Sequence, residues 1–126
     1  MSCFWDTLIN RLNNDLKKCM DTPVNPTNFV IFLKAYNQTT INVRWNGKEL
    51  TKQQCQENYS HINDYDISTI NNGYDCSCCD PFLLLVCEIM MIDIHNNYIG
   101  TNIIYSHILN KNNRHINIQN DKGHMK

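Results

Sequence analysis

The sequence has no apolar run long enough to cross a membrane and no block of basic residues. The longest apolar stretch, residues 81–92, is interrupted by Glu88, whereas a membrane-spanning helix needs about 20 apolar residues. The chain of 126 residues carries a net charge of −1. Because a surface that follows nucleic-acid phosphates needs a basic patch, we expect neither a membrane nor a nucleic acid as partner.

The chain also lacks the features of a secreted protein. Its N-terminus has no basic start followed by an apolar stretch, so no signal peptide is indicated. Seven cysteines cannot all pair with one another, and reduced thiols are typical of the cytosol. We therefore expect a cytoplasmic protein without structural disulfides and without a cofactor. The 20 Asn and 15 Ile residues indicate an AT-rich genome such as that of a large DNA virus, which would place the protein in the host cytoplasm or the virion.

The length is that of one domain, and no internal repeat or long linker divides it. Apolar residues at helical spacing, with Asp6 in the first turn and Lys17 and Lys18 in the last, predict a helix over residues 3–19. Further helices are predicted over residues 27–36, over residues 51–61 from a capping-box pattern, and from Asp80-Pro81 to residue 90. The last of these is apolar on nearly every side and should lie in the core.

Alternating apolar and polar residues predict short strands over residues 41–45, 92–95, 99–105 and 116–119. Asn46-Gly47 and Asn96-Asn97 are the expected turns between strands. Helices followed by a meander of short strands predict an α+β fold, a small antiparallel sheet packed by helices.

A cysteine at the start of a helix is a candidate nucleophile, because unpaired amides and the helix dipole stabilise its thiolate. Cys3 stands where the first predicted helix begins. The general base must come from elsewhere in the fold, and it is usually a histidine. His124, after a glycine and beyond the last predicted strand, is the best placed of five histidines. The alternatives are an ordinary thiol for Cys3 and a histidine of a disordered tail for His124.

The segment from Ser2 to Leu8 resembles the nucleophile segment of papain-fold cysteine peptidases of the ovarian-tumour (OTU) type, in which a Cys followed by an aromatic or aliphatic residue opens the first long helix. The apolar helix from Phe82, followed by Ile92-Asp93-Ile94, is similar to the family's central helix and strand. Ile116-Asn117-Ile118 with Gly123-His124 resembles its closing strand and catalytic histidine.

This resemblance implies a papain-like, OTU-like fold over residues 1–126 and a deubiquitinase-type peptidase. The Cys3 thiolate would attack the bond at the C-terminus of ubiquitin or a ubiquitin-like protein, and His124 would move the proton. Asp121 is the candidate third member of the triad. Trp45 and Tyr74, each beside a turn, are candidate substrate contacts, although a plain hairpin end is the favoured reading of Trp45. The oligomeric state is not indicated.

Two other classes of function remain open. The first is a binding or scaffold domain that keeps the OTU-like fold without catalysis. The second is a small viral interaction protein stabilised by zinc, with Cys76, Cys78 and Cys79 as half of a site. No second pair of cysteines stands at ligand spacing, so we favour these thiols as packing residues and predict no metal. The remaining histidines (His61, His95, His107 and His115) are expected at the surface.

Overall fold

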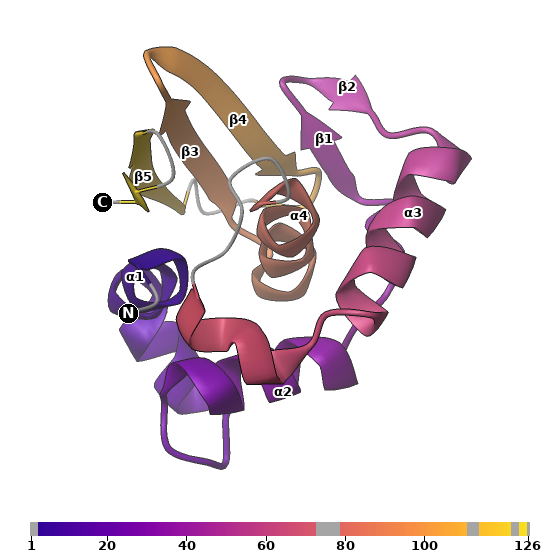
Figure 1. Cartoon of the computed structure of the whole chain (residues 1–126). Helices are drawn as coiled ribbons and strands as arrows, with labels where there is room; N and C mark the ends of the chain where they lie inside the picture. Colours follow the sequence, from indigo (N-terminus) through magenta and orange to yellow (C-terminus); the bar gives the residue numbers. More distant parts are fainter. Residues whose placement is uncertain (1–2, 73–78, 111–113, 122–123, 126) are drawn as a thin grey trace.

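The computed structural model describes residues 3–72, 79–110, 114–121 and 124–125 (Figure 1). The helices within these residues are α1 (Cys3–Cys19), α2 (Pro26–Ala35), α3 (Lys52–Asn63) and α4 (Cys79–Met90), with a 3-10 helix η1 (Ile67–Asn72) between the last two. The strands are β1 (Val43–Trp45), β2 (Lys48–Glu49), β3 (Asp93–Tyr98), β4 (Thr101–His107), β5 (His115–Asp121) and β6 (His124–Met125). The predicted α+β class is confirmed, and α1 has the bounds that the sequence indicates.

The strands form one sheet in the order β2-β1-β4-β3-β5-β6. All described pairings are antiparallel except that of β3 with β5, which is parallel and sets Asp93 opposite His115. The predicted antiparallel sheet is confirmed for the other described pairings, and the departure is that β5 does not continue the meander along the outer edge of β4. That edge of β4 is occupied by β1, so β5 joins the sheet on the other side of β3.

Two hairpins, β1–β2 and β3–β4, have turns that lie entirely within the described residues, and only the first turn lies where the sequence indicates. Asn46 and Gly47 turn between β1 and β2 with φ of 49° and 80°, as Asn-Gly favours. The β3–β4 turn falls at Ile99-Gly100 and not at Asn96-Asn97. Asn97 instead closes the hairpin from inside β3, because its Oδ1 accepts a hydrogen bond from the Gly100 amide at 3.0 Å.

The core lies between the helices and one face of the sheet. Every side chain of α4 from Phe82 to Cys87 is buried, which confirms the predicted central helix. The helix begins at Cys79, one residue before the predicted start at Asp80-Pro81. Trp5 of α1 meets Phe29 of α2 and Phe82 of α4 edge to face, with ring centroids 6.0 Å and 4.8 Å apart.

α3 flanks this core as a mostly polar helix with a well-defined start. The hydroxyl of Thr51 accepts from the Gln54 amide, and the Gln54 side chain accepts from the Thr51 amide, so the predicted capping box is formed. No helix in the described parts of the chain is long and apolar enough to span a bilayer.

Candidate functional site

Helix α1 is fastened to the start of β5 by an ion pair. One guanidinium nitrogen of Arg114, the residue before β5, donates to both carboxylate oxygens of Asp15 near the end of α1. This hydrogen bond and the negative charge of Asp15 raise the pKa of Arg114 above its ordinary value. The contact fixes which end of the helix lies beside which end of the strand.

A second contact, one turn earlier in α1, defines the direction of the helix along the strand. Arg11 Nε donates to the carbonyl oxygen of Asn117 at 3.0 Å. Moving from Asp15 to Arg11 along the helix therefore corresponds to moving from Arg114 to Asn117 along the strand. α1 runs antiparallel to β5, and its earlier turns lie toward the end of β5.

Extending this alignment brings the start of α1 level with the β5–β6 hairpin. From Arg11 back to Cys3 a helix advances about 12 Å, and from Asn117 forward to Asp121 a strand advances about 13 Å. Asp121 pairs with His124 across the hairpin, and α1 contacts β6 as well as β5. The backbones of Cys3, Asp121 and His124 thus belong to neighbouring elements at one end of the sheet.

The roles predicted for these three residues stay predictions. Their side chains lie outside the part of the structure that is described. Sequence reasoning identified the two elements correctly but expected the histidine after the strand. The structure adds a short strand, β6, that begins at His124 and holds its backbone against β5.

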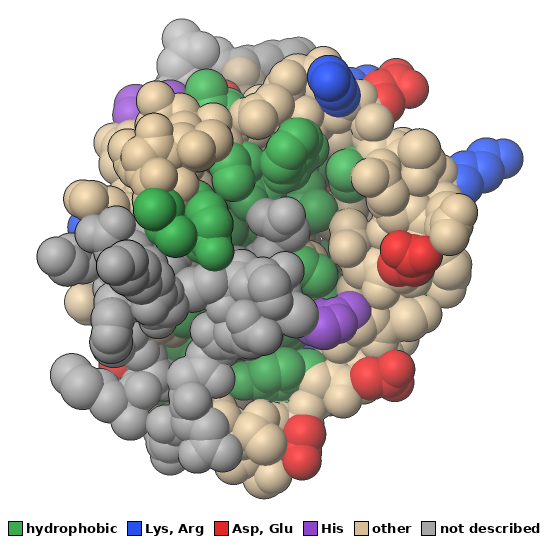
Figure 2. Space-filling model, turned by 45° about the horizontal axis from the view of Figure 1, so that its top comes forward, with side chains coloured by type: hydrophobic (Ala, Val, Ile, Leu, Met, Phe, Trp, Pro, Cys, Tyr) green, Lys and Arg blue, Asp and Glu red, His purple; other side chains and the backbone are tan. Residues whose placement is uncertain are grey.

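Trp45, a predicted substrate contact, lies at the other side of the sheet. It ends β1 and lines a pocket of about 460 Å³ between the β1–β2 hairpin and α3, together with Leu50, Leu84 and Glu57. In Figure 2, hydrophobic side chains gather in the middle of the face shown, and charged side chains lie toward its right rim. Since β4, β3 and β5 separate β1 from β6, these two strands lie about 19 Å apart across the sheet at the usual strand spacing, and Trp45 and His124 are further separated along the strands.

The structure therefore does not bring Trp45 to the candidate catalytic residues. Trp45 is the end of a hairpin, the reading that the sequence favoured, and only a large substrate could touch both places. Tyr74, the other candidate substrate contact, lies outside the described residues.

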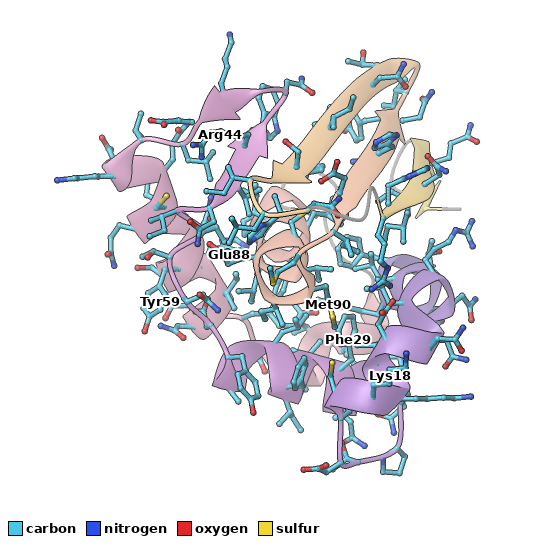
Figure 3. The ribbon with its side chains drawn as sticks, turned by 180° about the vertical axis from the view of Figure 1, so that it is seen from behind. Lys18, Phe29, Arg44, Tyr59, Glu88 and Met90 are labelled. Atoms are coloured by element: carbon cyan, nitrogen blue, oxygen red, sulfur yellow. The ribbon has the colours of Figure 1, made fainter. Side chains whose placement is uncertain are left out.

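His107 is buried and not at the surface as expected. Its Nε2 lies 2.9 Å from Oε2 of Glu88 on α4, and the exposed fractions of the two side chains are 2% and 4%. Glu88 lies between α4 and the start of β1 (Figure 3), where the Asn42 amide donates to Oε1 at 3.0 Å. The Asn42 side chain donates to Oε2 at 3.3 Å. Both carboxylate oxygens are therefore satisfied.

The hydrogen bonds of His107 determine its tautomer. The amide of Leu109 donates to Nδ1 at 3.0 Å, so Nδ1 carries no proton and Nε2–H donates to Glu88. With both ring nitrogens engaged, this imidazole has no free position for proton transfer to a substrate. The pair joins α4 to β4 and to the start of β1 and is not a catalytic dyad.

The sequence carried a signal for this pair. Glu88 interrupts the most apolar stretch of the chain, and a buried carboxylate needs donors that face it. The sequence did not predict which residues supply these donors. Asn42 and His107 lie far from Glu88 along the chain, and the pairing of β1 with β4 brings them to it.

The candidate zinc half-site cannot be placed. Cys76 and Cys78 lie outside the described residues, and Cys79 is the first residue of α4, without a described side chain. Among the side chains that are described, no group of three His, Cys, Asp or Glu residues could hold a metal ion. The described cysteines Cys19, Cys55 and Cys87 are free thiols.

Comparison with known proteins found no match of any kind. No protein-family model matches the chain, and neither a curated protein nor a solved structure is significantly similar to it.

Proposed function

We propose that the protein is a cysteine-dependent acyl hydrolase of the OTU-like type, with Cys3 as nucleophile and His124 as general base. The observation that carries the proposal is the antiparallel alignment of α1 with β5. Two tethers at Arg114 and Arg11 set this alignment. It brings the helix end that bears Cys3 level with the strand pair that bears Asp121 and His124.

The chemistry needs a thiolate beside a base. A helix N-terminus stabilises the thiolate, which attacks the carbonyl carbon of the substrate, and the bond to the leaving amine breaks. His124 gives its proton to that amine. When the amine departs, the acyl group remains on the sulfur of Cys3. His124 then removes a proton from water, which attacks the thioester and releases the acid. Asp121, paired with His124 in the hairpin, would orient the imidazole.

The substrate class follows from the resemblance of the sequence to OTU-type peptidases. It is the peptide or isopeptide bond at the C-terminus of ubiquitin or a ubiquitin-like protein. A globular substrate of that kind could extend across the sheet edge from the β5–β6 hairpin.

The test is labelling of the purified protein by ubiquitin that carries an electrophile at its C-terminus. We expect one covalent adduct, its absence in Cys3→Ala, and a rate about 10²-fold or more lower in His124→Ala. Cys19→Ala is the matched control, because Cys19 is an exposed thiol at the other end of the same helix. His61→Ala, an exposed histidine on α3, controls for loss of an imidazole.

Two results would overturn the proposal. The first is an adduct that persists in Cys3→Ala and disappears in Cys19→Ala. The second is the absence of any adduct from protein whose cooperative unfolding shows that it is folded.

A further inference from the structure

A polar hollow of about 520 Å³ lies on the sheet where β3, β4 and β5 are neighbours. We call it the outer hollow. The residues that line it are Arg11, His95, Asn96, Asn97, Asn102, Ile103, Ile104, Asn117, Ile118 and Gln119. None of them belongs to the elements that hold Trp45 or Glu88.

The hollow opens on the face of the sheet opposite the core. Successive side chains of a strand point to opposite faces. Asn96 and Ile118 are buried on the core side, whereas their neighbours His95, Asn97, Asn117 and Gln119 are partly or fully exposed. The strand backbones at the buried residues therefore form the floor, and the side chains of the exposed ones form the walls.

These walls contain one cation, Arg11, together with an imidazole and several amides, but no carboxylate. Arg11 reaches the hollow from α1 and is held by the bond from its Nε to the Asn117 carbonyl. Within the described part of the chain its two terminal amino groups have no hydrogen-bond partner, so their donors are free to bind a ligand. Asp93, the acidic residue of β3, does not line the hollow, and its Oδ1 accepts a hydrogen bond from the His107 amide at 3.1 Å.

The imidazole of His95 adds a further donor to the hollow. Its ring stacks on that of His115 on β5, which does not line the hollow, with centroids 4.7 Å apart and an interplanar angle of 18°. The His95 ring has no hydrogen bond to another described residue, so its nitrogens are available to a ligand. The Asn117 and Gln119 side chains, also without described partners, supply amide N–H groups beside it.

We propose that the outer hollow binds the phosphate of a small phosphomonoester, with Arg11 and His95 as the principal donors. A guanidinium fork binds two phosphate oxygens at once, which leaves the third oxygen to His95 or an amide of the wall. A lone phosphate ion would fill only a small part of the volume. The half-exposed side chain of Ile104 offers an apolar contact for the organic part of the ester.

This proposal is independent of the thiol chemistry at Cys3. It requires only the outer face of the sheet and Arg11, and a protein without peptidase activity could still bind the ester. Conversely, failure to bind the ester leaves the labelling experiment above unaffected.

The test is calorimetric titration of the full chain with adenosine 5′-monophosphate, and with adenosine as the matched ligand without phosphate. We expect binding of the first only, with inorganic phosphate as a competitor. Arg11→Gln and His95→Gln should each weaken binding about tenfold or more. The first removes the guanidinium that binds two phosphate oxygens, and the second removes the imidazole donor to the third. Lys18→Gln, which changes an exposed cation elsewhere on α1, should not.

His95→Gln keeps the proposal testable if Arg11→Gln fails to fold, because His95 does not fasten α1 to β5. Equal binding of adenosine and its phosphate would overturn the proposal, and so would unchanged affinity in both variants. An oligonucleotide without terminal phosphates should bind more weakly than the monoester. Tighter binding of the oligonucleotide would show that the hollow recognises a nucleic-acid backbone instead.

Discussion

Cys87 and Cys19 occupy opposite environments. Cys87 lies inside α4 and is fully buried. Burial, the larger cause, and the negative charge of Asp93, a smaller cause, raise the pKa of its thiol well above the ordinary value. Cys19 ends α1 at the surface. Because only the thiolate reacts readily, and only where a reagent can reach it, the two residues should differ greatly in reactivity.

We therefore expect iodoacetamide to modify Cys19 in the native protein and to leave Cys87 unmodified until the chain is unfolded. Peptide mapping by mass spectrometry after timed quenching measures each site separately. The same reaction in denaturant is the control and should modify both thiols. Equal rates at the two sites in the native protein would contradict the burial of α4.

Ile99 adopts a backbone conformation that its side chain disfavours. Its φ is 48°, whereas a β-branched residue in the left-handed region is strained by about 1–2 kcal/mol. The equivalent position in the β1–β2 hairpin is Asn46, which tolerates this conformation and also binds the Ile104 amide through its Oδ1. The β3–β4 hairpin thus lacks the turn residue that its geometry favours.

Ile99→Asn should stabilise the protein by about 1 kcal/mol, because asparagine relieves the strain and the lost side chain is half exposed. Urea unfolding followed by circular dichroism gives the change in midpoint. The matched control is Ile41→Asn, which replaces an exposed isoleucine outside the left-handed region and should have little effect. A lower midpoint for Ile99→Asn would show that the isoleucine side chain makes a favourable contact that outweighs the strain.

The polar contact between α4, β1 and β4 depends on a carboxylate at Glu88. Glutamine there would turn an N–H donor toward the Nε2–H of His107, or force the other tautomer and lose the bond from the Leu109 amide. Either outcome leaves a buried donor unpaired, so Glu88→Gln should destabilise the protein by about 2–3 kcal/mol.

Chemical denaturation of Glu88→Gln measures this loss. Glu57→Gln, on the exposed side of α3, is the control, because the Glu57 carboxylate is exposed and accepts a hydrogen bond from the Gln53 side chain on the same helix, so its loss should change stability by less than about 0.5 kcal/mol. Equal stability of the two variants would mean that Glu88 is not the acceptor of three hydrogen bonds.

Elements whose signals are local were predictable from the sequence. α1 combines an apolar stripe with charges suited to each helix end, and α3 carries a capping box, so neither needs tertiary information for its position. The position of Asn97 was not predictable in the same way. Asn97 lies within β3, and its side-chain Oδ1 accepts a hydrogen bond from the turn residue Gly100. Asn46, by contrast, is itself a turn residue.

Features that depend on distant partners were beyond the sequence. The parallel pairing of β5 with β3 follows from the occupation of β4 by β1, which no spacing in the chain reveals. The burial of His107 follows from the same sheet register, which sets it opposite Val43. For the candidate site, the start of α1 and the end of β5 were each predicted from the sequence. That they lie beside each other depends on the contacts of Arg11 and Arg114, which no local pattern indicates.

On the scale of the whole molecule, β5 is the strand near the end of the sequence on which the first helix, α1, packs. It closes the sheet against β3, buries Ile118, and receives α1 along its length. β6, by contrast, pairs only with the last two residues of β5. Loss of β6 should therefore remove the candidate base without removing the fold, whereas loss of β5 should expose the core.

Two truncations separate these roles. A chain that stops after Gly123 should still unfold cooperatively, with a midpoint lower by a few degrees, but should form the adduct with the ubiquitin electrophile about 10²-fold or more slowly, as His124→Ala should. A chain that stops after Arg114 leaves Ile94 and the edge of β3 without their neighbours. It loses about 1.5–3 kcal/mol for the buried Ile118 in addition to the whole pairing of β5, so it should show no cooperative transition. Thermal unfolding by circular dichroism and adduct formation on gels measure both outcomes. A folded chain ending at Gly123 that still forms the adduct at the full rate would exclude His124 as the base, while Cys3 would remain the nucleophile to be tested by its own variant.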